Sequence, residues 1–240
     1  GAPVEISRDT ADLLECALSY CADSDGRFDI TMGAAVQLWD LRRAIIPLQD
    51  ELREAVAHVD WRGVRVWEEG GRHFAQLTDP QAAVDVGGIA KGWIADKFTN
   101  ALVEAGLENF LINLGGNVVA HGEKPGGAAW NIGIRDPRNE GDIVGAMPIR
   151  NASTVTSGIY ERCCEVSGKF YHHILSPETG MPVETDVAGV TVVADRSIDA
   201  EGYSTTLLAL GTARGLAFAR EHPAIRKAIF VTRNRDVLES

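Results

Sequence analysis

The spacing of apolar residues predicts three helices within the first sixty residues. The first runs from an N-cap at Ser7 to a stop at Asp25-Gly26, with apolar positions three to four residues apart. The second begins at Gly33, after a turn that opens at Phe28. The third has Pro47 at its first position, where the missing N–H of proline costs no hydrogen bond.

Short apolar runs and alternating patterns predict strands through the rest of the chain. Trp130, Ile132 and Ile134 alternate with other residues, and Glu69-Gly70-Gly71 is typical of a hairpin turn. The predicted strands are residues 64–67, 74–77, 110–114, 118–120, 130–134, 143–149, 170–175, 190–194 and 228–232.

Three more helices are predicted among these strands. One follows Gly88 and ends before Gly106, and the other two are residues 201–210 and 213–220. The apolar face of the first is formed by Ile94, Phe98, Ala101 and Ala105. Hairpins outnumber strand–helix–strand units, so the pattern favours an α+β fold with a mixed, largely antiparallel sheet flanked by helices.

Composition and charge narrow the class of protein. The chain is 45% hydrophobic and 24% charged, which is ordinary for a soluble globular protein, and its net charge of −11 disfavours a nucleic acid partner. No apolar run reaches the roughly 20 residues of a membrane-spanning helix. No linker marks a boundary, so we expect residues 1–240 to form a single domain. The chain opens with Gly-Ala-Pro, and we expect it to be a processed or trimmed product.

Residues 84–92 form the most informative segment, Val-Asp-Val-Gly-Gly-Ile-Ala-Lys-Gly. A strand end runs through two glycines into a helix with Lys91 in its first turn. Glycines allow close approach of the backbone, the helix start offers N–H groups, and the lysine adds a charge, which together suit a phosphate. Glycines between a strand and a helix are also ordinary turn chemistry, so a plain turn stays open at this point.

Three further clusters of polar residues are candidates for a functional site. On a strand, His172 and His173 would point to opposite faces, so one histidine can enter a cleft. Glu201 and Thr205 are four residues apart on a helix and share a face, where they can offer oxygen ligands to Mg²⁺. Residues 25–29 form a turn with two carboxylates. Each cluster alone is also compatible with solvated polar side chains.

Together these segments resemble the ApbE family, the FAD:protein FMN transferases. The glycine segment 84–96 is similar to the family signature Asp-x-Gly-Gly-Ile-Ala-Lys-Gly-x-x-x-Asp almost letter for letter. The other similar segments, in chain order, are residues 26–41, 113–117, 156–162, 171–180 and 200–211. These six segments follow the family's order from residue 26 to residue 211, so the resemblance extends over nearly the whole chain.

The resemblance implies an activity and its residues. Family members bind FAD and Mg²⁺ and transfer the FMN half to a threonine hydroxyl of a target flavoprotein, releasing AMP. The implied FAD contacts are Arg27, Phe28, Asp29, Asp85, Lys91 and Ile174. The implied metal ligands are Gly88, through its carbonyl, Glu201 and Thr205, and the implied catalytic residue is His173.

Two departures from the family pattern stand out. The family has aspartate where this chain has Glu201. The extra methylene of glutamate shifts the position of the carboxylate, and the affinity for Mg²⁺ could fall because this ion demands near-octahedral geometry. The family also carries an N-terminal strand region with further FAD contacts, which is expected before Gly1 and is missing here.

Two alternative functions keep the same site. With water as the nucleophile the chain would be an Mg²⁺-dependent FAD pyrophosphatase giving FMN and AMP. Without turnover it would be a non-catalytic FAD-binding module, which the Glu201 substitution and the short N-terminus favour. The resemblance further implies an acceptor flavoprotein of an electron-transfer system, an extracytoplasmic location, and a possible membrane tether outside this chain.

Overall fold

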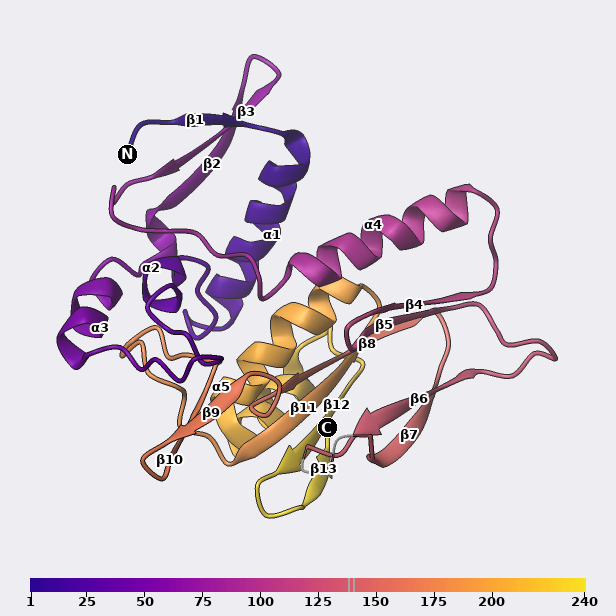
Figure 1. Ribbon diagram of the computed structural model, residues 1–240. Coiled ribbons are helices and arrows are strands. Elements are labelled where there is room, and N and C mark those ends of the chain that lie inside the picture. The colour runs from indigo at the N-terminus through magenta and orange to yellow at the C-terminus, as the bar shows by residue number, and fades with distance from the viewer. Residues whose placement is uncertain (138, 140) are drawn as a thin grey trace. The chain divides into compact units, whose positions relative to one another are not determined.

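The computed structural model describes residues 1–137, 139 and 141–240 (Figure 1). The chain forms two compact units. The first unit contains Gly1–Gly88 and Arg162–Val183, and the second contains Ile89–Glu161 and Glu184–Ser240. The chain therefore leaves the first unit inside the glycine segment, between Gly88 and Ile89, where no change in composition marks a boundary.

In the first unit a helix packs on a small antiparallel sheet. The sheet has the order β1–β3–β2, and α1 packs against β2 and β3 (Figure 1). A separate two-stranded hairpin is formed by β9 and β10. The elements of this unit are β1 (Val4–Ile6), α1 (Arg8–Asp23), α2 (Gly33–Val36), α3 (Gln49–Val56), a 3-10 turn (Trp61–Gly63), β2 (Val64–Glu69), β3 (Arg72–Leu77), β9 (Cys163–Val166) and β10 (Lys169–His172).

The predicted ends of α1 are confirmed. The Ser7 hydroxyl accepts the Thr10 N–H at 3.1 Å, and the chain leaves the helix through Asp25 (φ 51°) and Gly26 (φ 73°). The prediction that α3 begins at Pro47 is wrong by two residues. The N–H of Leu48 donates to Glu51 Oε2 at 2.8 Å, which fixes Leu48 as the N-cap.

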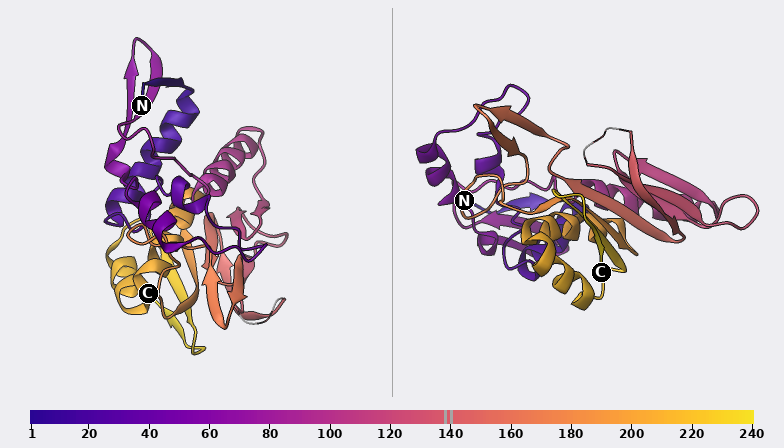
Figure 2. Two further views of the ribbon diagram at one scale, coloured as in Figure 1. Left: turned by 60° about the vertical axis from the view of Figure 1, so that its left-hand side comes forward. Right: turned by 90° about the horizontal axis from the view of Figure 1, so that it is seen from below.

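The second unit is built on a six-stranded antiparallel sheet of order β13–β12–β11–β8–β5–β4. Helix α5 packs against β11 and β8, and α4 packs against α5 (Figures 1 and 2). The elements are α4 (Ala90–Glu104), β4 (Phe110–Leu114), β5 (Asn117–His121), β6 (Trp130–Arg135), β7 (Ile143–Ile149), β8 (Ala152–Gly158), β11 (Val187–Ala194), α5 (Ser197–Glu221), β12 (Lys227–Thr232) and β13 (Val237–Glu239).

The largely antiparallel α+β prediction is confirmed, but a central strand was missed. β8 reads Ala-Ser-Thr-Val-Thr-Ser-Gly, and Ser153 and Thr154 are buried in it. Ser153 donates to the Val118 carbonyl at 3.1 Å, and the hydroxyls of Thr156 and Thr191 lie 2.8 Å apart. Hydroxyls that find partners across the sheet can occupy a core strand that shows no apolar pattern. The strands β1, β9 and β13 were also not predicted.

Helix α4 occupies the predicted range but buries another face. Ile94 is 45% exposed and Phe98 is 53% exposed, whereas Gly92 and Ala95 are buried. The packing side of α4 is thus its small-residue side, because α4 approaches α5 too closely for larger side chains. Helix α5 breaks at Gly211 (φ 75°, ψ 177°), which separates the two helices predicted there.

Candidate functional site

One group of predicted residues surrounds the turn after α1, in the first unit. Asp29 Oδ1 accepts the Thr31 N–H at 2.7 Å and the Thr31 hydroxyl at 2.6 Å, and Oδ2 accepts the Trp61 N–H at 3.1 Å. The N–H of Phe28 donates to the Ser24 hydroxyl at 3.0 Å. The Asp29 carboxylate therefore shapes the turn that presents Phe28, and Arg27 precedes it half-buried.

The glycine segment runs beside this turn. The Asp85 N–H donates to the Ile30 carbonyl at 2.7 Å, and the Asp85 carboxylate accepts the Gly87 N–H at 2.7 Å. A Cβ at Gly88 would lie 2.8 Å from Cε2 of Phe28. The aromatic ring thus occupies the place of a side chain at position 88, so two predicted site residues lie side by side. A larger residue at position 88 would have to displace the Phe28 ring.

The two histidines differ in burial and in hydrogen bonding. His172 is buried, and its Nδ1 accepts the Ile174 N–H at 3.3 Å. His173 is half-buried, and its Nδ1 lies 3.2 Å from the Arg162 carbonyl, to which its main-chain N–H also donates at 3.1 Å. Because a carbonyl only accepts, a hydrogen bond here requires the proton on Nδ1, and a neutral ring would then have its lone pair on Nε2. Ile174 is buried beside them.

A second group of predicted residues lies in the second unit, at the start of α4. Glu201 on α5 is buried, and its two carboxylate oxygens accept from Lys91 Nζ and from the Gly92 N–H. Burial raises the pKa of Glu201, while Lys91 and the Gly92 N–H act to lower it. The helix start and lysine that were expected to receive a phosphate are thus directed at a carboxylate of the protein itself.

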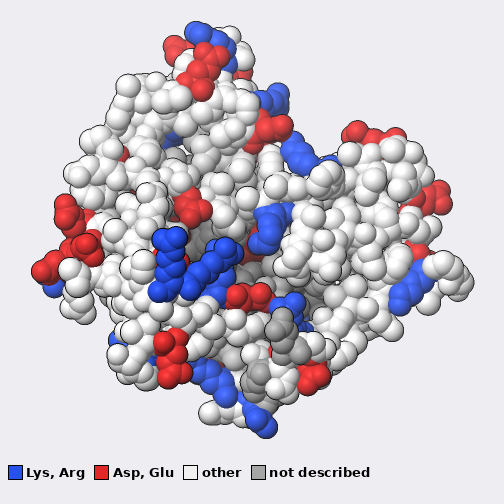
Figure 3. All heavy atoms as spheres, in the orientation of Figure 1, with Lys and Arg blue, Asp and Glu red and all other residues white. Residues whose placement is uncertain are grey.

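This ion pair differs from the surface pairs of the chain. Acidic and basic side chains are scattered over the face drawn in Figure 3 and adjoin in several places. In the pair Arg135–Glu161 both side chains are well exposed, at 49% and 42%, and such pairs contribute little. In Lys91–Glu201 the lysine is 49% exposed but the carboxylate only 4%. The Glu201 charge is therefore far less screened by water and depends on its partners.

At the starts of α4 and α5, a carboxylate from each helix accepts backbone N–H groups of the other. Asp96 on α4 accepts the N–H groups of Ser197 and Ile198 at 2.7 and 3.0 Å, just as Glu201 on α5 accepts that of Gly92. The N-cap residues themselves are an isoleucine and an arginine, which have no side-chain acceptor. Each helix thus obtains its N-terminal acceptor from the other.

The close approach of these helices has a steric condition at Gly92. A Cβ there would lie 2.6 Å from the Ile198 Cα and 2.7 Å from the Ser197 carbonyl oxygen. The two helix starts therefore meet backbone to backbone. Burial raises the pKa of Asp96, and the two N–H groups that it accepts work against that rise.

Replacing Asp96 with alanine is expected to lower the free energy of unfolding by about 2 kcal/mol, because two buried N–H groups lose their acceptor. Urea unfolding of the full chain measures the change. Glu104→Ala removes an exposed acid from the far end of the same helix and should change the stability by less than about 0.5 kcal/mol. Equal effects of the two substitutions would contradict the capping role of Asp96.

The proposed metal ligands can be judged by their chemistry. Glu201 and Thr205 lie one turn apart on α5, before its break at Gly211, and the Thr205 hydroxyl is 3.5 Å from that of Ser157. Within residues 1–137, 139 and 141–240, no three His, Cys, Asp or Glu side chains form a cluster that could hold a metal ion. The predicted set has a single carboxylate with a hydroxyl and a carbonyl. Three oxygen donors fit a hard cation such as Mg²⁺.

The structure therefore places the predicted residues in two groups. Arg27, Phe28, Asp29, Asp85, Gly88, His173 and Ile174 belong to the first unit, and Lys91, Glu201 and Thr205 belong to the second. Direct contacts join Phe28 with Gly88 and Lys91 with Glu201.

Sequence reasoning assigned no role to Asp96 or to Asn117. Asn117 is buried, its Oδ1 accepts the Ser197 hydroxyl at 2.6 Å, and its amide helps to lower the pKa of Glu201. Its Nδ2 nevertheless makes no hydrogen bond of good geometry with the residues described. The available signal for Asp96 was the glycine-segment signature itself, which ends in this aspartate. Asp96 also lies four residues after Gly92 and so shares its helix face.

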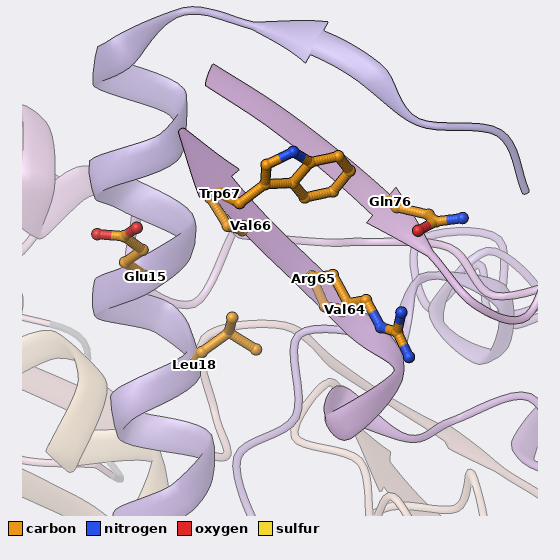
Figure 4. A pocket seen from close by; sticks show the side chains of 7 residues that line it. All are labelled: Glu15, Leu18, Val64, Arg65, Val66, Trp67 and Gln76. Atoms are coloured by element: carbon orange, nitrogen blue, oxygen red, sulfur yellow. The ribbon is translucent and has the colours of Figure 1, made fainter. Parts of the chain in front are cut away.

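A cavity of about 560 Å³ lies elsewhere in the first unit, between α1 and the β2–β3 hairpin (Figure 4). It is lined by Glu15, Leu18, Val64, Arg65, Val66, Trp67 and Gln76. None of these seven residues belongs to the predicted site. In the described part of the chain, no helix is long and apolar enough to cross a membrane.

Comparisons with a family pattern and with known proteins all indicate the same family. The sequence pattern of the ApbE family matches residues 1–230. An FAD:protein FMN transferase of Treponema pallidum is 39% identical over all of this chain and 70% of its own length. One of Klebsiella pneumoniae is 36% identical over 99% of this chain and 73% of its own length.

Solved structures agree with this result. The ApbE protein of Thermotoga maritima superimposes with a TM-score of 0.89 at 28% identity, over 100% of this chain and 78% of its own. The flavin transferase ApbE of Vibrio cholerae gives a TM-score of 0.83 at 27% identity, over 100% and 76% of the two chains. The family pattern thus extends across both units, and this chain belongs to the ApbE family.

Proposed function

We propose that this chain is an FAD:protein FMN transferase, which transfers the FMN moiety of FAD to a threonine hydroxyl of a target flavoprotein with Mg²⁺ and releases AMP. The observation that carries the proposal is the 39% identity, over the whole chain, to a protein of that name. Threonine as the acceptor, AMP as the product and dependence on Mg²⁺ follow from the family resemblance.

His173 is the proposed proton acceptor. Its Nδ1–H donates to the Arg162 carbonyl, which leaves the lone pair of the neutral ring on Nε2. In the reaction, the threonine oxygen forms a bond to the FMN phosphorus, the bond between that phosphorus and the bridging oxygen breaks, and AMP leaves with the bridging oxygen. The threonine proton passes to Nε2 of His173.

The remaining residues bind and orient the substrate. Arg27, Phe28, Asp29, Asp85, Lys91 and Ile174 are the proposed FAD contacts, as the family resemblance implies. Glu201, Thr205 and the Gly88 carbonyl would hold Mg²⁺. When bound, the metal would neutralise charge on the diphosphate. Burial of the Glu201 carboxylate supports this role, since it limits the competing contacts with water.

We further propose that both units act as one flavin transferase domain over residues 1–240, because the family pattern matches residues 1–230. The proposed partner is a flavoprotein of an electron-transfer system, outside the cytoplasm, with a possible membrane tether beyond this chain. These statements about partner and location rest on the family resemblance alone.

The test is incubation of the chain with FAD, MgCl₂ and a candidate acceptor flavoprotein, followed by mass spectrometry of the acceptor and quantification of AMP. We expect a mass gain equal to FMN, one AMP for each modified acceptor, and loss of both when EDTA is present in excess. An acceptor with the target threonine replaced by valine is the matched control and should stay unmodified.

Two outcomes would contradict the proposal. Release of AMP from FAD in the absence of any acceptor, without modification when the acceptor is added, would indicate a pyrophosphatase. Binding of FAD without turnover under all conditions would indicate a non-catalytic flavin-binding module.

A further inference from the structure

The oxygens of Glu201 that are proposed to bind a metal already accept from two donors of α4. Oε1 accepts from Lys91 Nζ, and Oε2 accepts from the Gly92 N–H. We propose that Lys91 and a divalent cation compete for the Glu201 carboxylate, so that metal binding releases the lysine amine. This inference rests on the proposed function, because it concerns the metal ligand of the same site.

Charge makes the two positions exclusive. The Glu201 side chain is only 4% exposed, so water does little to screen charges placed around it. An ammonium in contact with one carboxylate oxygen and a doubly charged ion on the same carboxylate would repel each other strongly. One carboxylate cannot neutralise three positive charges, so one cation has to leave.

Lys91 is the donor that can leave. The Gly92 N–H is fixed by the backbone of α4, which packs against Ile198 so closely that a Cβ would lie 2.6 Å from its Cα. The lysine side chain is 49% exposed and ends a flexible stem, so it can turn into solvent without a change in the fold. The Gly92 bond would then keep the carboxylate in place while the cation beside it is exchanged.

The exchange gives Lys91 a function that depends on the metal. The released amine stays at the start of α4, two residues after Ile89 and three residues after Gly88. A diphosphate bound there would meet an amine that is no longer paired with an acid of the protein. Metal and diphosphate would therefore bind cooperatively through the change of partner of one lysine, and the coupling must hold in both directions.

The first experiment measures the affinity of the full chain for Mg²⁺ by calorimetry, without FAD, in the wild type, Lys91→Met and Lys97→Met. We expect Lys91→Met to bind Mg²⁺ about tenfold more tightly, because no ammonium has to be displaced. Lys97 lies on the same helix but stacks on Trp93, with Nζ 4.8 Å from the ring centroid, so Lys97→Met should stay within about twofold of the wild type. Thermal unfolding confirms that each variant is folded.

Unchanged or weaker Mg²⁺ binding by Lys91→Met would overturn the inference, as would equal gains in the two variants. Absence of Mg²⁺ binding by both the wild type and Lys91→Met would overturn it as well. Since calorimetry uses no FAD and no acceptor, these results are independent of the transfer assay. A wild type that transfers FMN while Lys91→Met shows no gain keeps the proposed function and removes only the competition.

The second experiment follows the lysine itself. Brief acetylation of the wild type with acetic anhydride, with and without saturating MgCl₂, is read out for each lysine by mass spectrometry. The ratio of Lys91 to Lys97 acetylation is expected to rise severalfold with Mg²⁺, because the Lys91 amine leaves its carboxylate. A ratio that stays constant or falls would show that the lysine keeps its partner and would contradict the exchange.

Discussion

Replacing His173 with alanine is expected to lower the rate of FMN transfer by about 10²- to 10⁴-fold, the usual contribution of a positioned general base. FAD affinity should change little, since the predicted FAD contacts lie at other residues. The measurement combines the transfer rate at saturating FAD with FAD binding followed by flavin fluorescence. Undiminished transfer by His173→Ala would remove the proposed role of this histidine.

A second substitution separates the base from the hydrogen bond that orients it. His173→Asn places an amide nitrogen where Nδ1 stands, so the bond to the Arg162 carbonyl can persist, but the side chain has no counterpart of Nε2. We expect His173→Asn to be as slow as His173→Ala. Recovery of most of the transfer rate by asparagine would mean that His173 positions the loop and does not accept the proton.

Gly92→Ala is expected to lower the free energy of unfolding by about 3 kcal/mol, although alanine favours a helix by about 1 kcal/mol over glycine. The added Cβ would meet backbone atoms of Ser197 and Ile198 at 2.6 to 2.8 Å, and a backbone cannot move aside as a side chain can. The starts of α4 and α5 would have to separate, which also removes the bond between Gly92 and Glu201. Urea unfolding measures the loss.

The matched control is Gly145→Ala in β7 of the same unit. A Cβ there has nothing within 4 Å, so its effect should stay within about 0.5 kcal/mol. If Gly92→Ala were equally harmless, the two helix starts would not meet as closely as described, and the role of Gly92 in holding Glu201 would fall with it.

Local patterns predicted the elements whose cause is local. Ser7 and the Asp25-Gly26 turn define α1 because capping and a left-handed backbone depend on neighbouring residues only. The hairpin at Gly70-Gly71 joins β2 and β3 for the same reason. The break between the two helices predicted at 201–210 and 213–220 falls at Gly211, whose φ of 75° is a backbone conformation that glycine adopts without strain.

Tertiary packing determines the position of β8 in the sheet and the buried face of α4, which the local sequence pattern did not predict. The polar strand β8 is central because its hydroxyls find partners on β11 and at the start of α5, such as Ser153 with Ser197 at 3.0 Å. The apolar face of α4 with Ile94 and Phe98 is exposed because contact with α5 selects the side with Gly92. Such preferences follow from a neighbour that is remote in sequence.

The sequence motifs predicted which residues belong to the candidate site. They could not predict the contacts between site residues that are far apart in the sequence. Glu201 and Thr205 share a helix face as their spacing requires. That Glu201 lies against Lys91, 110 residues earlier, could not be read from either segment alone. The role of Asp96 has the same origin, because its partners Ser197 and Ile198 follow about a hundred residues later.

The reciprocal capping of α4 by Glu201 and of α5 by Asp96 also affects how this region unfolds locally. If the first turn of α4 unwound, Gly92 would withdraw from Glu201 and leave a buried negative charge short of a donor. If the first turn of α5 unwound, Asp96 would lose both of its donors. Fraying at either helix end is therefore penalised by the other, so the two turns should melt together as one cooperative segment.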